Sequence, residues 1–235
     1  MNPEPCIGLI IPSGNRLTEP QFNRYLPARV GAYVTRLRMA GKHRKPLSEL
    51  RRPLTEAAEA LSDIRPDLIV FHCTANSMES GLAHERAIVD IIAQASGCPT
   101  ITTAQALTQA FHHLGIRKLV LISPYVQATN QFEVNYLNEA GFTVLHELGL
   151  ALDSHAYSSV TPEVWRQVVK ANLRAEADGY FLSCTNTRMI EAVADLERDL
   201  GQPVINSNQA TIWACLKKLG IQHRDPRLGR LFNAN

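Results

Sequence analysis

The chain has 235 residues, of which 45% are hydrophobic and 20% charged, and its formal net charge is +2. This is the composition of an ordinary globular protein with enough residues for a sizeable core, and the low net charge carries no signature of nucleic-acid binding. Because no apolar run approaches the ~20 residues of a membrane span and the first residues lack a signal-peptide pattern, we expect a cytoplasmic protein that contacts neither membrane nor nucleic acid.

Short apolar runs alternate with helix-forming segments along the whole chain. In chain order the pattern predicts strand 7–11, helix 54–63, strand 68–72, helix 79–95, strand 100–102, helix 104–114, strand 119–123, helix 130–140, strand 143–148, helix 162–175, strand 180–183, helix 188–200, strand 204–206 and helix 210–219. Strands separated by helices of this length indicate βαβ units and parallel sheets. In such sheets, ligands bind beyond the carboxyl ends of the strands.

Three pairs of segments recur in the same order at an offset of about 110 residues. Residues 67–76 and 178–187 each contain an acidic residue, a short apolar run and a Cys-Thr pair, while 97–106 resembles 201–210 and 7–13 resembles 119–125. The period exceeds the roughly 20–50 residues of a solenoid unit. The fold class predicted is therefore α/β, with two similar Rossmann-like lobes whose parallel sheets are related by pseudo-twofold duplication. We expect residues 1–105 plus about 207–235 in the first lobe, residues 106–206 in the second, and the active site in the cleft between them.

Two of the five cysteines, Cys73 and Cys184, occupy equivalent positions in the repeat. The odd number and wide scatter argue against a disulfide framework, and without a Cys-x-x-Cys motif we expect no zinc site. A cysteine after a buried strand is often a small core hydrophobe. However, Cys73 and Cys184 are each followed by Thr, with Asn76 and Asn186 close behind. Such residues favour loops and helix starts, where free backbone N–H groups stabilise a thiolate.

Asn15 and Tyr125 lie in the equivalent loops after the first strand of each half. Each has a structural interpretation, as a turn residue or a partly buried aromatic side chain. If the two lobes face each other, both side chains instead donate hydrogen bonds to a substrate carboxylate. Because the paired cysteines already favour a shared site, we expect this second role.

The segment Arg36–Arg52 is locally basic. No aromatic residues interleave with its charges and no nucleic-acid-binding module surrounds it. A solvated loop is the expected interpretation, and a lip that steers a dianionic substrate is the alternative.

Four segments carry a resemblance to a known family. Residues 8–20 (GLIIPSGNRLTEP), the Cys73-Thr74 loop, residues 183–188 (SCTNTR) and residues 203–210 (PVINSNQA) resemble the maleate cis-trans isomerases of the aspartate/glutamate racemase superfamily. Residues 97–149 and 229–232 also resemble arylmalonate decarboxylase, a close relative that keeps only the second cysteine. The presence of both cysteines favours an isomerase or racemase.

The resemblance implies roles for individual residues. Cys73 matches the family's nucleophile or base, and Cys184 matches the partner acid on the opposite face of the substrate. The substrate-binding set that it implies, through side chains or backbone amides, is Asn15, Thr74, Ala75, Asn76, Tyr125, Thr185, Asn186 and Asn208. The implied function is a cofactor-independent isomerase of a small dicarboxylate, with an enediolate-type intermediate and neither cofactor nor metal. The implied binding partner is a small mono- or dicarboxylate substrate.

Several alternatives remain at this point. An aspartate/glutamate-type racemase and an arylmalonate-type decarboxylase share the same intermediate, so the motifs discriminate poorly among the three reactions. A non-catalytic dicarboxylate-binding protein would keep the cleft without the chemistry, and a redox dithiol is a further option. The sequence is compatible with a homodimer.

Overall fold

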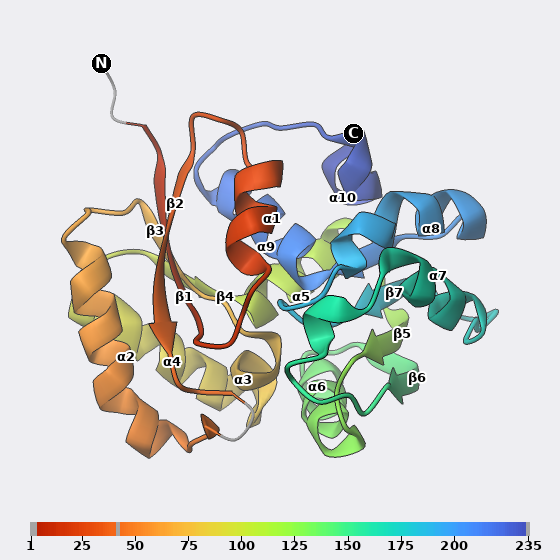
Figure 1. Cartoon of the computed structure of the whole chain (residues 1–235), viewed down its shortest axis with the longest axis horizontal. Coiled ribbons are helices and arrows are strands. Elements are labelled where there is room, and N and C mark those ends of the chain that lie inside the picture. Colours follow the sequence, from red (N-terminus) through yellow and green to blue (C-terminus); the bar gives the residue numbers. More distant parts are fainter. Residues whose placement is uncertain (1–3, 41–42, 234–235) are drawn as a thin grey trace.

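Two four-stranded parallel sheets lie side by side (Figure 1) in the computed structural model, which describes residues 4–40 and 43–233. The strands of the first sheet are β1 (Cys6–Pro12), β2 (Gly31–Leu37), β3 (Leu68–Phe71) and β4 (Thr100–Thr102). Those of the second are β5 (Lys118–Ser123), β6 (Thr143–Gly149), β7 (Gly179–Leu182) and β8 (Val204–Asn206). Their spatial orders are β2-β1-β3-β4 and β6-β5-β7-β8. Because each strand of one sheet has a counterpart at the same place in the other, the predicted duplication is confirmed.

Helices cover the outer face of each sheet and fill the space between the sheets. They are α1 (Thr18–Tyr25), α2 (Leu47–Ser62), α3 (Thr74–Met78), α4 (Gly81–Ser96), α5 (Thr103–His113), α6 (Gln127–Glu139), α7 (Pro162–Lys170), α8 (Val193–Leu200), α9 (Ser207–Lys218) and α10 (Gly229–Asn233). The 3-10 turns η2 (Tyr157–Ser159), η3 (Met189–Ala192) and η4 (Pro226–Leu228) lie between these elements. Apolar residues of α2 and α4 pack on β1 and β3, and those of α7 and α8 pack on β5 and β7.

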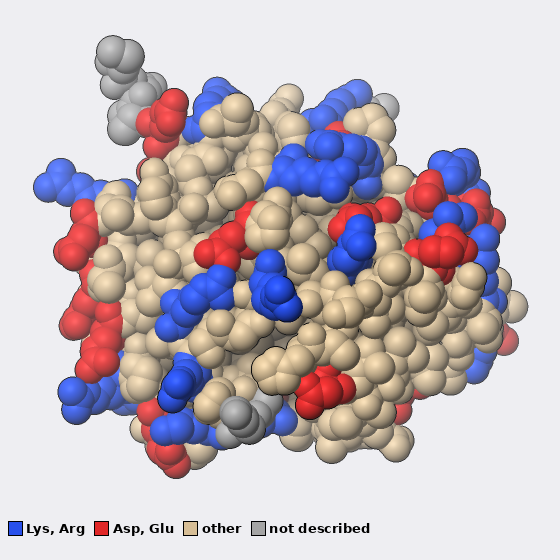
Figure 2. Space-filling model, viewed as in Figure 1, with Lys and Arg blue, Asp and Glu red and all other residues tan. Residues whose placement is uncertain are grey.

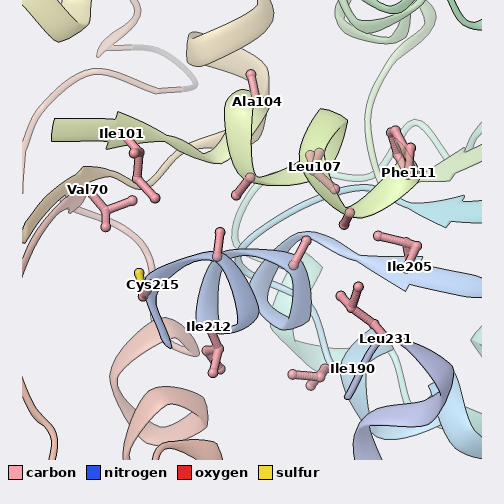
Figure 3. Packing of buried hydrophobic residues seen from close by; sticks show 14 of the residues in the cluster. Val70, Ile101, Ala104, Leu107, Phe111, Ile190, Ile205, Ile212, Cys215 and Leu231 are labelled. Carbon is pink, nitrogen blue, oxygen red and sulfur yellow. The ribbon is translucent and has the colours of Figure 1, made fainter. Parts of the chain in front are cut away.

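One continuous apolar core joins the two halves. Helices α5 and α9, which follow β4 and β8, pack on each other in this core (Figure 3). The ring of Phe111 on α5 meets that of Phe181 on β7 edge-on, with centroids 5.4 Å apart. The proposed lobe boundary at residue 105 falls inside α5, and α10 packs on α8. The division into 1–105 with about 207–235, and 106–206, stays a prediction.

The recurrence of 97–106 at 201–210 has a direct structural cause. Gly97 ends α4 with φ of 66°, and Gly201 ends α8 with φ of 67°, a left-handed conformation that glycine adopts without steric cost. After the next strand, Thr102 caps α5 by accepting a hydrogen bond from the Gln105 N–H at 3.1 Å. Asn206 caps α9 in the same way, within a capping box. The repeated letters therefore encode a repeated turn, strand and helix cap.

Other segments differ from the predicted pattern. The strand β2 and the helices α1, α3 and α10 were not predicted, whereas the predicted helix 79–95 corresponds to α4, which begins at Gly81. Helix α2 begins at Leu47 and contains Pro53, so it extends well before residue 54. The interpretation of Arg36–Arg52 as a loop is wrong for its ends, since Arg36 lies on β2 and Arg52 on α2. Residues 41–42 of that segment lie outside the described residues.

Charged side chains of both signs are interspersed on the face shown in Figure 2, and neither sign dominates it. This distribution agrees with the low net charge of the chain. Across residues 4–40 and 43–233, no helix combines the length and apolar character that crossing a membrane requires.

Candidate active site

The two paired cysteines lie at the carboxyl ends of equivalent strands. Cys73 follows β3 and is the N-cap residue of α3, while Cys184 follows β7. Both side chains are buried, with 5% and 4% of their surfaces exposed. The charge of Cys73 contributes to raising the pKa of Cys184, so the two thiols are close enough to interact electrostatically. The structure thus brings the two predicted thiols into one site.

Direct hydrogen bonds join the loops of the two halves around these cysteines. The Asn15 side-chain amide donates to the Thr185 carbonyl at 3.2 Å and to the Thr185 hydroxyl at 3.0 Å. The backbone N–H of Arg16 donates to Asn186 Oδ1 at 2.8 Å. The carboxyl ends of the two sheets therefore meet, as the predicted location of the site requires.

Ser207, at the start of α9, links the two cysteine loops. Its hydroxyl oxygen accepts a hydrogen bond from the Thr74 hydroxyl at 2.9 Å and another from the Cys184 N–H at 3.2 Å. Ser207 is fully buried, so these bonds are shielded from water. No local sequence signal identified this residue, because its role depends on α9 packing between the sheets.

Both thiols have hydrogen-bond partners that act on their charge, but burial dominates. The Cys73 thiol donates to Asn76 Oδ1 at 3.1 Å, and the Asn76 backbone N–H lowers its pKa. Cys184 Sγ accepts from the Asn186 N–H at 3.3 Å and interacts with the Tyr125 hydroxyl. Burial nevertheless raises the pKa of each thiol to about 12. The expected lowering of the thiol pKa by loop donors is therefore wrong for the resting site, since desolvation outweighs it.

The backbone at Cys184 is strained. Its φ of 131° lies in a region that residues with a side chain rarely adopt, whereas the equivalent Cys73 has an ordinary φ of −151°. The Cys184 N–H donates to Ser207, and the Cys184 carbonyl accepts from the Thr187 hydroxyl at 3.3 Å. These bonds hold a conformation that aims the Cys184 loop differently from the Cys73 loop. Such strain clusters at functional sites.

Two tyrosines border the thiols. Tyr125 follows β5 and is buried, and desolvation raises its pKa well above the ordinary value. The ring of Tyr157 on η2 meets the Tyr125 ring edge-on with centroids 5.6 Å apart. Burial also raises the pKa of Tyr157, with further contributions from the charges of Cys184 and Cys73. Tyr157 is thus a site residue that sequence analysis missed, because it lies in a loop outside the repeated motifs.

The predicted substrate-binding asparagines are engaged with protein groups. Asn15 Oδ1 accepts from the backbone N–H groups of Leu17 and Thr18, while its amide binds Thr185. Asn208, at the start of α9, is fully buried. Both therefore hold the two halves together, and their predicted contact with substrate stays a prediction. The remaining members of the predicted set, Thr74, Ala75 and Asn76, lie together on α3.

Asn208 makes hydrogen bonds to three other segments. Its amide donates to Gln21 Oε1 on α1 and to the Thr185 carbonyl at 3.1 Å, and its Oδ1 is 2.8 Å from His72 Nε2. Because an amide oxygen can only accept, His72 Nε2 is the donor of this hydrogen bond. Burial lowers the pKa of His72 to about 4, so the ring is neutral at neutral pH.

Replacing Asn208 with alanine is expected to lower the free energy of unfolding by about 3 kcal/mol, because it leaves several buried polar groups unpaired at roughly 1–3 kcal/mol each. Urea denaturation measures this change. The matched control is Asn135→Ala, since Asn135 is exposed and accepts one surface bond from Gln131. A loss at Asn208 no larger than the control would contradict the network's structural role.

Besides the thiols and the tyrosine phenols, the site contains a carboxyl group that the sequence did not indicate. Glu133 on α6 is fully buried and accepts a hydrogen bond at 2.8 Å from the hydroxyl of Ser183, the residue directly before Cys184. Among the residues that the structure describes, no group of three or more histidine, cysteine or carboxylate side chains could hold a metal ion. The acidic groups of the candidate site are thus the thiols of Cys73 and Cys184, the phenols of Tyr125 and Tyr157 and the carboxyl of Glu133.

Comparisons with known proteins agree with this arrangement. The family model of arylmalonate decarboxylase matches residues 7–232. The maleate isomerase of Pseudomonas putida is 28% identical over 97% of this chain and 96% of its own length. The arylmalonate decarboxylase of Bordetella bronchiseptica is 27% identical over 68% of each chain.

A solved structure of the Nocardia farcinica maleate cis-trans isomerase has a similar fold, with a TM-score of 0.89 at 22% identity, covering 98% of this chain and 99% of its own. That protein is a cysteine-to-serine variant with a covalently bound succinylcysteine intermediate. The resemblance found in the sequence is confirmed: the chain belongs to the arylmalonate decarboxylase family and is an enzyme related over nearly its whole length to maleate isomerases.

Proposed function

We propose that this protein is a cofactor-independent isomerase of a small dicarboxylate, of the maleate cis-trans type. The observation that carries the proposal is the pair of interacting thiols, Cys73 and Cys184, where the carboxyl ends of the two sheets meet. A single thiol suffices to protonate an enediolate. A second thiol, from the opposite half, adds a nucleophile or base.

The relatives support this choice. The match to the Pseudomonas putida maleate isomerase spans 97% of the chain, whereas the match to the arylmalonate decarboxylase spans 68%. The succinylcysteine in the Nocardia farcinica protein is the product expected when a cysteine adds to maleate. In this chain we assign that addition to Cys73.

The reaction begins from the state in which Cys73 is a thiolate and Cys184 keeps its proton. Its sulfur adds to one alkene carbon, an S–C bond forms, and the π electrons move into the adjacent carboxylate as an enediolate. Cys184 donates its proton to the other carbon, which gives a succinyl thioether. Rotation about the new single bond follows, Cys184 takes the proton back, and expulsion of the Cys73 thiolate restores the alkene in the trans form.

Fixed donors would stabilise the charge that develops on the carboxylate. We assign this role to the backbone amides of Thr74, Ala75, Asn76 and Thr185 and to the Tyr125 hydroxyl, with Asn15, Asn186 and Asn208 completing the substrate-binding set. Preorganised donors of this kind contribute strongly in a site shielded from water. The burial of both thiols supports such shielding.

A decarboxylase is the second candidate, and the match of the arylmalonate decarboxylase family model over residues 7–232 favours it. In that reaction, loss of carbon dioxide from a 2-substituted malonate would leave an enediolate that Cys184 alone protonates. A racemase would use the two thiols to remove and return an α-proton on opposite faces.

Assays of the unmodified protein separate these reactions. Maleate, 2-phenylmalonate and each enantiomer of aspartate are followed separately by proton NMR. We expect conversion of maleate to fumarate. Turnover of phenylmalonate without turnover of maleate would replace the isomerase by the decarboxylase, and binding without any turnover would leave a dicarboxylate-binding protein.

A further inference from the structure

Glu133 is a buried acid that the thiol mechanism does not use. It projects from α6, the helix that follows the Tyr125 loop, and none of its surface is exposed. One carboxyl oxygen, Oε1, accepts the Ser183 hydroxyl at 2.8 Å. The other, Oε2, is buried and has no hydrogen-bond partner among the described residues. Buried polar atoms are nearly always paired, so Oε2 requires an explanation.

The groups that sense the charge of Glu133 are those of the candidate site. A negative charge on Glu133 raises the pKa of Cys73, Cys184, Tyr125 and Tyr157. These four residues follow β3, β7 and β5 or lie on η2, so the charge of Glu133 acts on residues from both halves of the site.

Charged groups on the other elements packed against α6 face different residues of that helix. Glu85 on α4 adds to the effect of burial in raising the pKa of Tyr136, and Glu147 on β6 accepts a hydrogen bond from the Asn130 side chain. The Arg44 guanidinium lies 4.3 Å from the centre of the Phe132 ring and forms an ion pair with Glu79. None of them contributes to the pKa of Glu133, which burial raises to about 8 against the lowering effect of the Ser183 bond. The carboxyl is therefore protonated at neutral pH.

The position of that proton follows from the hydrogen bonds. Because Oε1 accepts from Ser183, the proton resides on Oε2, which makes Oε2 a buried donor without an acceptor. A carboxylic acid kept neutral by an apolar environment is an effective donor to an anion. An oxygen with negative charge, as in a carboxylate or an enediolate, would accept this hydrogen bond.

We propose that Glu133 is a substrate-binding acid of this site, whose Oε2–H donates a hydrogen bond to a carboxylate or enediolate oxygen of the bound molecule. The proposal rests on the proposed function, since it needs a carboxylate substrate. It also makes binding depend on the protonation of Glu133. The folded-state pKa lies above the ordinary value, so the donor is present below pH 8 and is lost as the pH rises through that value, when the ionised carboxylate repels the substrate.

Calorimetric titration with succinate, which has two carboxylates but no alkene, tests the proposal on the unmodified protein and two variants. For the unmodified protein we expect the affinity to fall about tenfold per pH unit above pH 8, as the binding-competent fraction declines. Glu133→Gln keeps a donor and an acceptor but cannot ionise, so its affinity should stay constant to pH 9. Glu133→Met lacks the donor, and we expect at least about tenfold weaker binding at pH 7.

The outcomes separate this proposal from the proposed function. An unchanged pH dependence in Glu133→Gln, or an unchanged affinity in Glu133→Met, overturns the role of Glu133 while leaving the isomerase intact. If the unmodified protein binds neither succinate nor maleate, both proposals fall. Thermal melts verify folding, and if Glu133→Met does not fold, the pH profile of Glu133→Gln decides alone.

Discussion

Replacing Cys184 with alanine is expected to lower maleate turnover by about 10³-fold, which corresponds to about 4 kcal/mol of barrier. The variant keeps Cys73 but loses the proton donor on the other face of the substrate, so the addition product cannot be processed at a useful rate. Steady-state kinetics by proton NMR measure the loss. Turnover of 2-phenylmalonate, if the protein has it, should fall by a similar factor because that reaction also uses Cys184.

The matched control for this experiment is Cys6→Ala. Cys6 is a half-buried cysteine at the start of β1, at the amino end of the strand and thus opposite the site. Its replacement should leave turnover within about twofold, because surface substitutions away from special features are close to neutral. A Cys184→Ala variant as active as this control would remove Cys184 from the mechanism.

Replacing Cys73 with alanine should separate the two candidate reactions. Isomerisation needs a nucleophile that forms the S–C bond, so maleate turnover should again fall about 10³-fold. Decarboxylation needs only a donor to the enediolate, so turnover of 2-phenylmalonate should be retained within a few-fold. The ratio of the two activities, measured on the same preparation, is the informative quantity.

Two results would count against these assignments. If Cys73→Ala keeps full maleate turnover, Cys73 is not the nucleophile. If it retains phenylmalonate turnover while the unmodified protein shows no activity with maleate, the decarboxylase replaces the isomerase. Circular dichroism of each variant confirms that a loss of activity is not a loss of fold.

The repeat in the sequence was sufficient to predict the architecture. Residues 67–76 and 178–187 became β3 and β7 with their cysteine loops, and 97–106 and 201–210 became equivalent turns, strands and capped helices. These features depend on local chemistry, namely left-handed glycines, strand-forming apolar runs and side-chain caps, which the sequence displays directly.

The strand β2 and the first part of helix α2, which the sequence did not predict, lack such signals. The strand β2 lies at the edge of the first sheet, and all seven of its residues are partly or fully exposed, so the sequence lacks the apolar run that marked the central strands. Helix α2 contains Pro53, which resembles a helix boundary from the sequence alone. In both cases tertiary packing outweighs the local pattern.

The electrostatics of the site could not be predicted from the sequence either. Donors beside Cys73 and Cys184 suggested easily ionised thiols, but only the fold reveals that both are buried and that desolvation raises their pKa. Glu133 and Tyr157 lie far along the chain from the cysteine motifs, and the packing of α6 and η2 brings them to the site.

The central claim is that Cys73 and Cys184 act on one substrate from opposite halves of the molecule. Mass spectrometry of the Cys184→Ser variant after incubation with maleate tests it most directly. We predict that the peptide containing Cys73 gains the mass of one maleic acid, as a succinyl thioether that solvent protonates slowly in place of Cys184 and that the variant cannot resolve, and that the double variant Cys73→Ala, Cys184→Ser gains none. An unmodified Cys73 peptide, from a protein whose unaltered form isomerises maleate, would contradict the claim.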